Sequence, residues 1–283
     1  MIIRESHQQL IQQLSTIYPV GEADAIAERV LEALTGMNRL DRRAQPERPL
    51  TPAHQEKLAG WTTRLLMQEP VQYVLGEAWF CGQKLFVDRN VLIPRPETEE
   101  LVDWIVRSRQ KPNLRILDVG TGSGCIAIAL GSQLPGAHVW ACDVSEAALE
   151  IARKNAANAG IALQFISINF LDRSTHILLP EVDILVSNPP YIPAHQQSEM
   201  AANVVNYEPH IALFVPDNDA LVFYEALADY ALTRLLPGGS VFAEIHEDLA
   251  AAVTKLFRQK GFETEIRKDM QGKDRMVCAK RKK

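Results

Sequence analysis

The sequence predicts an α/β fold in which a largely parallel sheet is covered by helices on both faces. From Leu114 onward, strand-like runs alternate with helical runs, a pattern typical of repeated β-α-β units. Residues 3–68 instead carry apolar side chains at helical spacing, and residues 78–87 form short aromatic and β-branched runs. These observations predict a small helical domain, a β-hairpin and an α/β domain, in that order.

The chain is long enough for more than one domain. Its 283 residues exceed the length of a typical single domain. With 47% hydrophobic and 23% charged residues, the composition is that of a globular protein able to bury a sizeable core. We therefore expect a soluble protein of two domains.

Residues 1–70 are expected to form the helical N-terminal domain. Apolar residues recur there at helical spacing, at Leu10, Ile11, Leu14, Ile26, Val30, Leu34, Leu58, Leu65 and Leu66. Turn signals at 19–21 and 46–52 separate the helices. Residues 23–25 are expected to open the second helix, and Gly36 is expected to cap its C-terminus.

Residues 71–97 are expected to contain a hairpin that links the two domains. Ala78–Cys81 and Lys84–Val87 resemble short strands, and Gly82-Gln83 between them is the predicted turn. The regular alternation of strands and helices begins only after this segment. The hairpin is therefore placed between the domains.

Residues 98–283 are expected to form the α/β domain. Its strand-like and helical runs are Leu114–Val119, Cys125–Leu134, His138–Cys142, Glu146–Ala159, Gln164–Ile168, Val182–Ser187, Ala220–Leu236, Ser240–Ile245 and Leu249–Lys260. Two further strands, Glu263–Arg267 and Arg275–Ala279, follow with only a short link between them. We therefore expect one of these two strands to lie antiparallel at the edge of the sheet.

A glycine-rich turn follows the first strand of this domain. Glycines 120, 122 and 124, separated by Thr121 and Ser123, stand between the strand and the next helix. Glycine lets the backbone turn sharply and approach a ligand, while the helix N-terminus offers free N–H groups. Asp118 precedes the turn, where a carboxylate can hold an ammonium group or order the loop donors. The pattern predicts a nucleotide site at the carboxyl edge of the sheet.

Two further residues are candidates for the same site. Asp143 ends the second strand, where a carboxylate can accept hydrogen bonds from both hydroxyls of a ribose. The alternative role is capping the helix that begins near Glu146, which Ser145 can also do. After the third strand, Phe170 is placed to lie against an adenine ring and Asp172 to accept from its amine. Each of these two can equally serve as a core or cap residue.

The fourth strand leads directly into Asn188-Pro189-Pro190-Tyr191. Two consecutive prolines cannot continue a strand, and they stiffen the exit from the sheet. The oxygen of Asn188 and the carbonyl of Pro189 can accept hydrogen bonds from the two N–H groups of a planar NH₂ group, while Tyr191 packs against that flat group. Such a nitrogen is a poor nucleophile and must be held in line with a methyl-sulfonium bond. The motif therefore indicates methyl transfer to a planar amino group.

Charge and cysteine content narrow the class of protein. The net charge is −5 and the pI is about 5.8, which argues against a nucleic-acid partner. The one dense basic run, Lys280–Lys283, is typical of a solvated tail. The cysteines, Cys81, Cys125, Cys142 and Cys278, form no C-x-x-C pair, so we expect reduced thiols and no metal site. A polar N-terminus and the lack of any 18-residue apolar run predict a cytoplasmic protein without membrane association.

The two motifs, with the link Val91–Glu99, closely resemble the release factor glutamine N5-methyltransferases, the HemK/PrmC family. The resemblance extends over nearly the whole chain, including Gln72–Gly76. It implies a seven-stranded Rossmann-like class I methyltransferase sheet, mostly parallel, behind a helical substrate-recognition domain. It also implies S-adenosyl-L-methionine as the cofactor and, as the substrate, the glutamine in the Gly-Gly-Gln motif of peptide chain release factors.

The resemblance also implies roles for individual residues. The cofactor-binding residues are expected to be Gly120, Thr121, Gly122, Ser123, Gly124, Asp143, Phe170 and Asn188. The substrate amide is expected to meet Asn188, Pro189, Pro190 and Tyr191, of which Asn188, Pro189 and Tyr191 are the expected catalytic residues. Arg95 and Glu97 are expected to be structural or substrate-channel residues. One departure is that Glu244–Asp248 stands where many members have a glycine and a glutamine; His246 is expected to be a loop residue.

Three alternatives remain open at this stage. An adenine N6-methyltransferase presents its flipped target base to a similar motif, but it requires a basic groove and a target-recognition domain. A glutamine methyltransferase of a ribosomal protein shares the chemistry. A non-catalytic dinucleotide-binding module would explain the glycine loop alone, but it would give no reason for Asn188–Tyr191.

Overall fold

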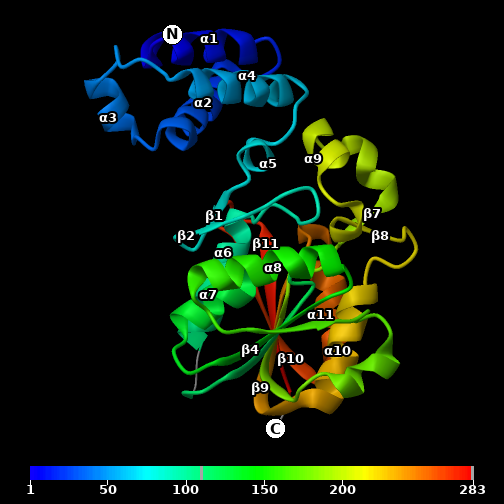
Figure 1. Cartoon of the computed structure of the whole chain (residues 1–283). Coiled ribbons are helices and arrows are strands. Elements are labelled where there is room, and N and C mark those ends of the chain that lie inside the picture. Colours follow the sequence, from blue (N-terminus) through cyan, green and yellow to red (C-terminus); the bar gives the residue numbers. More distant parts are fainter. Residues whose placement is uncertain (109–110, 282–283) are drawn as a thin grey trace. The chain divides into compact units, whose positions relative to one another are not determined.

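The computed structural model describes residues 1–108 and 111–281, which fall into two compact units (Figure 1). The helical unit comprises Met1–Glu77 and Ala201–Tyr207, and the α/β unit comprises Ala78–Met200 and the chain from Glu208 onward. Of the predicted basic tail, residues 282–283 lie outside the described part. Residues 280–281 belong to the last strand, so this part of the run is not a free tail.

The helical unit is built around a single apolar core. Its helices are α1 (Ile3–Leu14), α2 (Val20–Thr35), α3 (Arg39–Ala44), α4 (Pro52–Leu66), α5 (Val71–Leu75) and α9 (Ala202–Tyr207). The predicted apolar positions Leu10, Leu14, Val30, Leu34 and Leu65 are buried in this core. Helical spacing put them on one face of each helix, and burial of that face stabilises the unit.

The ends of these helices follow from local sequence. Gly36 adopts a left-handed φ of 68° and caps α2, as predicted. The start of α2 was misplaced: the helix begins at Val20, directly after Pro19, and not at residues 23–25. Proline can precede or open a helix because the first N–H groups have no partner within the helix. At α4, the Thr51 side chain accepts from the N–H of His54 at 3.1 Å.

The hairpin forms one residue earlier than predicted. Strands β1 (Ala78–Phe80) and β2 (Gln83–Leu85) pair antiparallel. The turn residues are Cys81 and Gly82, with φ of 48° and 75°, so Gln83 already belongs to the second strand. Two positive φ values match the twist of a two-residue hairpin.

A mostly parallel seven-stranded sheet forms the centre of the α/β unit, as predicted, in the order β10-β11-β9-β6-β3-β4-β5. Its strands are β3 (Arg115–Val119), β4 (His138–Asp143), β5 (Gln164–Ser167), β6 (Val182–Ser187), β9 (Leu235–Glu244), β10 (Phe262–Lys268) and β11 (Asp274–Arg281). The pairs β3-β4, β3-β6, β4-β5 and β6-β9 are parallel.

The antiparallel strand is not at the edge of the sheet. Strand β11 runs antiparallel to both β9 and β10 and lies between them, so β10 is the edge strand. An antiparallel neighbour was predicted correctly, but its position was not. Short links favour antiparallel pairing of consecutive strands. The sequence near these two strands does not indicate which of them pairs with β9.

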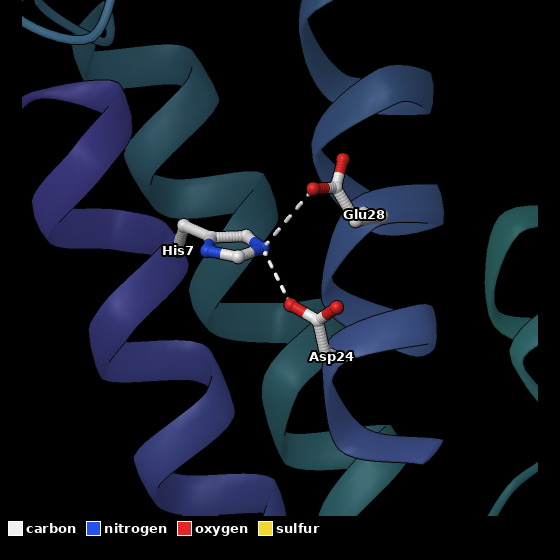
Figure 2. A group of neighbouring side chains, drawn as sticks. All are labelled: His7, Asp24 and Glu28. Atoms are coloured by element: carbon white, nitrogen blue, oxygen red, sulfur yellow. Dashed lines mark ion pairs between the residues drawn. The ribbon is translucent and has the colours of Figure 1, made fainter. Parts of the chain in front are cut away.

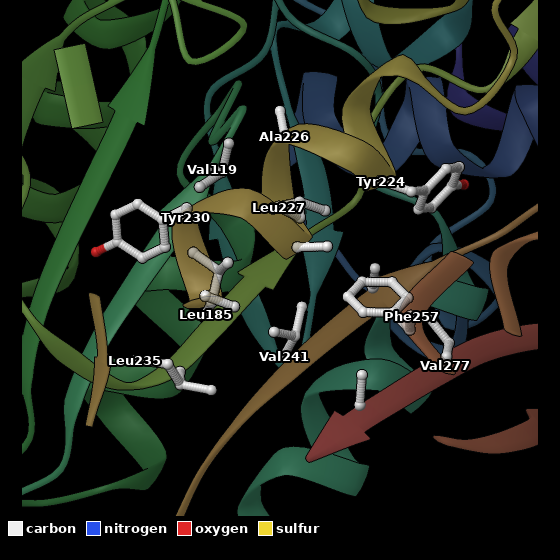
Figure 3. Packing of buried hydrophobic residues seen from close by; sticks show 14 of the residues in the cluster. Val119, Leu185, Tyr224, Ala226, Leu227, Tyr230, Leu235, Val241, Phe257 and Val277 are labelled. Atoms are coloured by element: carbon white, nitrogen blue, oxygen red, sulfur yellow. The ribbon is translucent and has the colours of Figure 1, made fainter. Parts of the chain in front are cut away.

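Helices cover both faces of the sheet. One face carries α6 (Pro96–Ser108), α7 (Cys125–Gln133) and α8 (Glu146–Ala159), and the other carries α10 (Val222–Arg234) and α11 (Ala250–Gln259). Figure 3 shows the packing on the α10/α11 face, where Leu185 and Val241 lie near Leu227 and Tyr230. Among the described helices, none combines the length and apolar character needed to cross a membrane.

Residues 192–219 form short elements that the sequence pattern did not predict. They are β7 (Ile192–Pro193), η2 (Ala194–Glu199), α9, η3 (His210–Ala212) and β8 (Phe214–Val215), where η denotes a 3₁₀ helix. Within the helical unit, the hydroxyl of Tyr207 in α9 donates to the carbonyl of Met67 at 2.6 Å. Elements of two to six residues are too short for a periodic pattern to identify.

Candidate active site

A cavity of about 340 Å³ lies at the carboxyl edge of the parallel strands. The loops after β3, β4, β5 and β6 line it, because parallel strands bring these loops to one edge. It brings together these residues predicted from sequence: Gly120, Gly122, Asp143, Phe170, Asn188 and Pro190. The remaining predicted residues lie outside its lining: Thr121, Ser123, Gly124, Pro189 and Tyr191.

Glycines shape the loop after β3. Gly120 and Gly122 have φ of 69° and 55°, and a Cβ added at either would meet no protein atom within 4 Å. This backbone is strained for other residues, and its open side faces the cavity. Gly124 serves packing instead, because its Cβ would lie 3.1 Å from the side chains of Ala152 and Ile128.

The two hydroxyl residues of the loop are buried in the protein. Thr121 is 4% exposed and its hydroxyl donates to Asp118 Oδ2 at 2.6 Å. Ser123 is 2% exposed. Burial raises the pKa of Asp118 to about 7. Of the two roles considered for Asp118, the described contacts support ordering of the turn.

Asp143 connects the glycine loop to α8. Its Oδ2 accepts from the N–H of Gly122 at 2.9 Å, and its Oδ1 accepts from the N–H of Ser145 at 2.9 Å. The helix cap is Ser145, whose hydroxyl accepts from the N–H of Ala148 at 3.2 Å. Each carboxylate oxygen can accept a second hydrogen bond, so Asp143 retains capacity for a ligand hydroxyl in the cavity.

Phe170 closes the cavity on the side of β5. It is 5% exposed and packs against His176 and Tyr230, with ring centroids 4.6 and 5.7 Å away. Asp172 is a cap: its Oδ1 accepts from the N–H and the hydroxyl of Ser174, at 3.0 and 2.7 Å. The described contacts thus give the capping role to Asp172 and a cavity-lining position to Phe170.

Asn188 directly follows Ser187, the last residue of β6. The hydroxyl of Ser187 donates to the carbonyl of Val119 at 2.8 Å, which fixes the end of the strand. Asn188 Nδ2 donates to Thr98 Oγ1 at 3.1 Å. Tyr191 is not among the residues that line the cavity, and its hydroxyl donates to Glu244 Oε1 at 3.2 Å. Burial and the neighbouring carboxylate raise the pKa of Tyr191, so its phenol stays protonated.

Glu208 joins two walls of the cavity. Its buried carboxylate accepts from the N–H of Ile93 at 3.1 Å and from the Arg95 guanidinium at 2.5 Å. Cavity-lining residues 90–92 directly precede Ile93, and the lining residues Pro209, Ile211 and Ala212 follow Glu208. Arg95 therefore makes a structural contact, which is one of the two roles considered for it.

Several cavity residues were missed by sequence reasoning. They are Asn90, Val91, Leu92, Ile168, Pro209, Ile211, Ala212 and Phe223. Val91 and Leu92 belong to the link Val91–Glu99 that carried the family resemblance, and Asn90 directly precedes it, so this link was the available signal. No pattern marked the residues from Pro209 onward. His246, expected in a loop, caps η4 (Glu247–Leu249), with its ring 5.9 Å from that of Tyr191.

The helical unit contains a second polar cluster, shown in Figure 2. His7 Nε2 lies 3.3 Å from Asp24 and 3.6 Å from Glu28, close enough for the three groups to be compared with a metal site. Arg39 and Arg42 pair with Glu28 as well. Two guanidinium groups already neutralise this carboxylate, which disfavours a bound cation, so we interpret the cluster as an ion-pair network.

Comparison with protein families assigns both parts of the chain. Residues 5–76 match the model described as PrmC N-terminal domain. Residues 98–209 match the model described as Methyltransferase small domain, which spans the glycine loop, Asp143 and the Asn188–Tyr191 motif. Both motifs of the cavity thus lie within a methyltransferase domain.

Curated relatives match along nearly the full length. The Release factor glutamine methyltransferase of Flavobacterium psychrophilum is 42% identical over 98% of this chain and 98% of its own. That of Bacteroides thetaiotaomicron is 40% identical, over 95% of this chain and 97% of its own. The chain belongs to the release factor glutamine methyltransferase family. As a member of that family, it is an S-adenosylmethionine-dependent methyltransferase.

Solved structures confirm the fold of this family member. A methyltransferase from Pyrococcus furiosus superimposes with a TM-score of 0.51 at 17% identity, covering 78% of this chain and 98% of its own. A ribosomal protein L11 methylase from Lactobacillus delbrueckii subsp. bulgaricus gives 0.50 at 21% identity, covering 70% and 84%. At such identities the likeness concerns the class I methyltransferase fold.

The cavity fits S-adenosylmethionine on its own chemistry. The open side of Gly120 and Gly122 admits a ligand against the backbone, and the carboxylate of Asp143 can accept from a diol. Phe170 and Ile168 supply an apolar surface for a flat ring. These groups together suit a nucleoside.

Proposed function

We propose that the enzyme methylates the side-chain amide nitrogen, N5, of the glutamine in the Gly-Gly-Gln motif of peptide chain release factors. The observation that carries this proposal is that Asn188 lines the same cavity as Gly120, Gly122 and Asp143. Groups that suit a methyl donor and a group that suits a planar amide therefore share one chamber. The names of the full-length relatives support the choice of substrate.

We assign the part of the cavity formed by the loops after β3, β4 and β5 to the methyl donor, the cofactor. Asp143 would accept from the ribose hydroxyls, Phe170 would lie against the adenine, and the loop from Gly120 to Gly124 would meet the amino-acid portion. Asn188 would lie at the junction with the substrate. Within the loop, we expect Thr121 and Ser123 to contribute through the shape of the turn, since both side chains are buried.

The acceptor half would orient the amide. Asn188 Oδ1 and the carbonyl of Pro189 would accept hydrogen bonds from the two N–H groups of the substrate amide. These bonds would align the nitrogen and stabilise the positive charge that develops on it. When bound, S-adenosylmethionine supplies an electrophilic methyl group. Methylation makes the amide nitrogen acidic, so its proton leaves to water and no general base is needed. Tyr191, neutral and half-buried, would support the loop as a packing residue.

We further propose a division of labour along the chain. Residues 1–70 would recognise the release factor, residues 71–97 would link the domains, and residues 98–283 would carry out the transfer. The match of residues 5–76 to the PrmC N-terminal domain supports this division. A release factor as the substrate places the enzyme in the cytoplasm, where translation takes place.

Transfer of a labelled methyl group tests the proposed substrate. Purified enzyme is incubated with labelled S-adenosylmethionine and, separately, with a release factor, the same factor with its Gly-Gly-Gln glutamine replaced, ribosomal proteins, and nucleic acid. We expect label on the intact release factor only. Label on the replaced factor would place the modification at another residue. Label on ribosomal protein or nucleic acid alone would refute the proposal and favour one of the alternatives.

A further inference from the structure

A buried carboxylate lies behind the Asn188–Tyr191 loop. Glu244, at the end of β9, is 2% exposed, and Thr98, in α6, is also 2% exposed. Glu244 Oε2 accepts from the hydroxyl of Thr98 at 2.7 Å, and Oε1 accepts from the hydroxyl of Tyr191 at 3.2 Å. A single side chain outside the motif thus holds Tyr191 directly and reaches Asn188 through Thr98.

The direction of these hydrogen bonds follows from the ionised form of Glu244. An ionised carboxylate can only accept, so in this form the hydroxyl hydrogen of Thr98 points to Glu244. The oxygen of Thr98 then has only lone pairs to offer Asn188. Asn188 must therefore turn its NH₂ group toward Thr98, at 3.1 Å, and its Oδ1 away from it.

This direction selects the orientation of Asn188 that suits an amide substrate. An asparagine side chain can present either its oxygen or its NH₂ group after a 180° rotation, and the two have nearly the same shape. An NH₂ group facing the substrate would meet another NH₂ group and could accept no hydrogen bond. The oxygen can accept one N–H of the substrate amide.

We infer that Thr98 and Glu244 are positioning residues that hold Asn188 with its oxygen toward the substrate nitrogen. The inference rests on the proposed role of Asn188 as the acceptor of the substrate N–H. It assigns no contact with substrate to either residue. Both act through Asn188, and Glu244 also acts through Tyr191.

The surroundings hold Glu244 rigidly. Its backbone pairs with Met276 of β11, and its carbonyl accepts from the hydroxyl of Tyr224 at 3.0 Å. Thr98 is held by its N–H, which donates to the carbonyl of Arg95 at 3.1 Å. A hydrogen-bonded side chain on a central strand and one on a packed helix are the supports that an oriented catalytic group requires.

Replacing the hydroxyl of Thr98 by a methyl group tests the inference. In Thr98→Val, the NH₂ group of Asn188 loses its acceptor while the side-chain volume is nearly kept. We expect kcat for release-factor methylation to fall about 10- to 100-fold, with KM and the Kd for S-adenosylmethionine changed less than about threefold. Thr98→Ser keeps the hydroxyl and should restore most of the activity. Thr233→Val, which removes a hydroxyl bonded within α10, is the matched control.

A double-variant comparison separates positioning from general damage. If Thr98 acts through Asn188, Thr98→Val should have no further effect in an Asn188→Ala background, because the group that it orients is absent. Additive losses, a failure of Thr98→Ser to recover, or an equal loss of cofactor binding would overturn the inference. The wild-type enzyme is assayed alongside the variants. If the wild type does not methylate the release factor, the proposed function fails. If the wild type methylates it and Thr98→Val is equally active, only the positioning role is refuted.

Discussion

The two loops that meet in the cavity are held by different means. The glycine loop is shaped mainly by its backbone: Gly120 and Gly122 have positive φ angles, and the N–H groups of Gly120 and Thr121 donate to the carbonyl of Cys142 at 2.9 and 3.1 Å. The carboxylates of Asp118 and Asp143 add side-chain bonds to this loop. The Asn188–Tyr191 loop is fixed by side chains, which bond to Thr98 and Glu244.

This difference predicts two kinds of sensitivity. A loop shaped by its backbone should be destabilised by any added side chain, whatever its polarity, because a positive φ disfavours one. A loop fixed by side-chain hydrogen bonds should tolerate changes of equal shape only if donors and acceptors are kept. The variants below separate the two, in order of decreasing expected effect.

Gly122→Val should have the largest effect. A β-branched residue at φ of 55° is strained, and its bulk would occupy the open side of the loop in the cavity. We expect the Kd for S-adenosylmethionine, measured by calorimetry, to rise by more than about 100-fold. Gly272→Val is the matched control, since Gly272 also has a positive φ, 84°, and open space but lies in the link between β10 and β11. Equal cofactor affinities of the two variants would contradict the loop assignment.

Asn188→Ala should abolish most of the transfer and spare most of the binding. The change removes an orienting acceptor without adding bulk, so kcat should fall about 100-fold or more while the Kd for S-adenosylmethionine changes only a few-fold. Single-turnover transfer and equilibrium binding, measured on one preparation, give the two numbers. A fully active variant would refute the role given to Asn188.

Acidification should reduce kcat through Glu244. Burial raises the pKa of this carboxyl, opposed by its bond from Thr98 and by Arg275, while Tyr191 and Glu97 also lie near it. Protonation therefore begins at a higher pH than for an exposed glutamic acid, and it frees the hydroxyl of Thr98 to rotate. We expect kcat to fall at acidic pH in the wild type. Glu244→Gln should be a few-fold slower near neutral pH and should lack this fall; an unchanged pH profile would exclude Glu244 as its source.

Asp118 should affect stability and not the transfer step, and its effect should depend on pH. Because burial raises its pKa to about 7, the stability contributed by its protonated form is fully present below the pKa of the unfolded chain, about 4, and is lost as the pH rises through about 7. Asp118→Asn removes that loss. We expect the variant without cofactor to gain about 3–4 kcal/mol in free energy of unfolding at pH 8, relative to wild type, compared with pH 4. Urea unfolding of the variant and the wild type at pH 4 and pH 8 measures this gain. The same difference in free energy of unfolding at both pH values would exclude a raised pKa of Asp118.

Local patterns explain why the two motifs were predictable. The glycine loop and Asn188–Tyr191 each follow a strand directly, so the topology of a parallel sheet brings them to one edge. Thr98 and Glu244 were not predicted as functional, because each is a single polar residue in an otherwise ordinary helix or strand. Their relation to Asn188 exists only in the folded chain.

For the fold as well, features set by local sequence were predicted, and features set by contacts between distant segments were missed. The α8 helix was predicted with its observed bounds, Glu146–Ala159, because Ser145 caps it and Gly160 ends it. The position of β11 between β9 and β10 was missed, since pairing between distant strands leaves no local trace. Likewise, Pro209–Ala212 reaches the cavity only through the folding of short elements and the contacts of Glu208.

The position of β11 has a consequence for how the sheet is completed. Strand β10 precedes β11 in sequence, yet its neighbour in the sheet is β11, which alone connects it to β9. During synthesis, the outer edge of β9 must remain open until Asp274–Arg281 has been made, and β10 has nowhere to pair. Contacts between distant segments form slowly, and unpaired edges favour aggregation. The nascent α/β unit is therefore expected to be most vulnerable in the interval between β9 and β11.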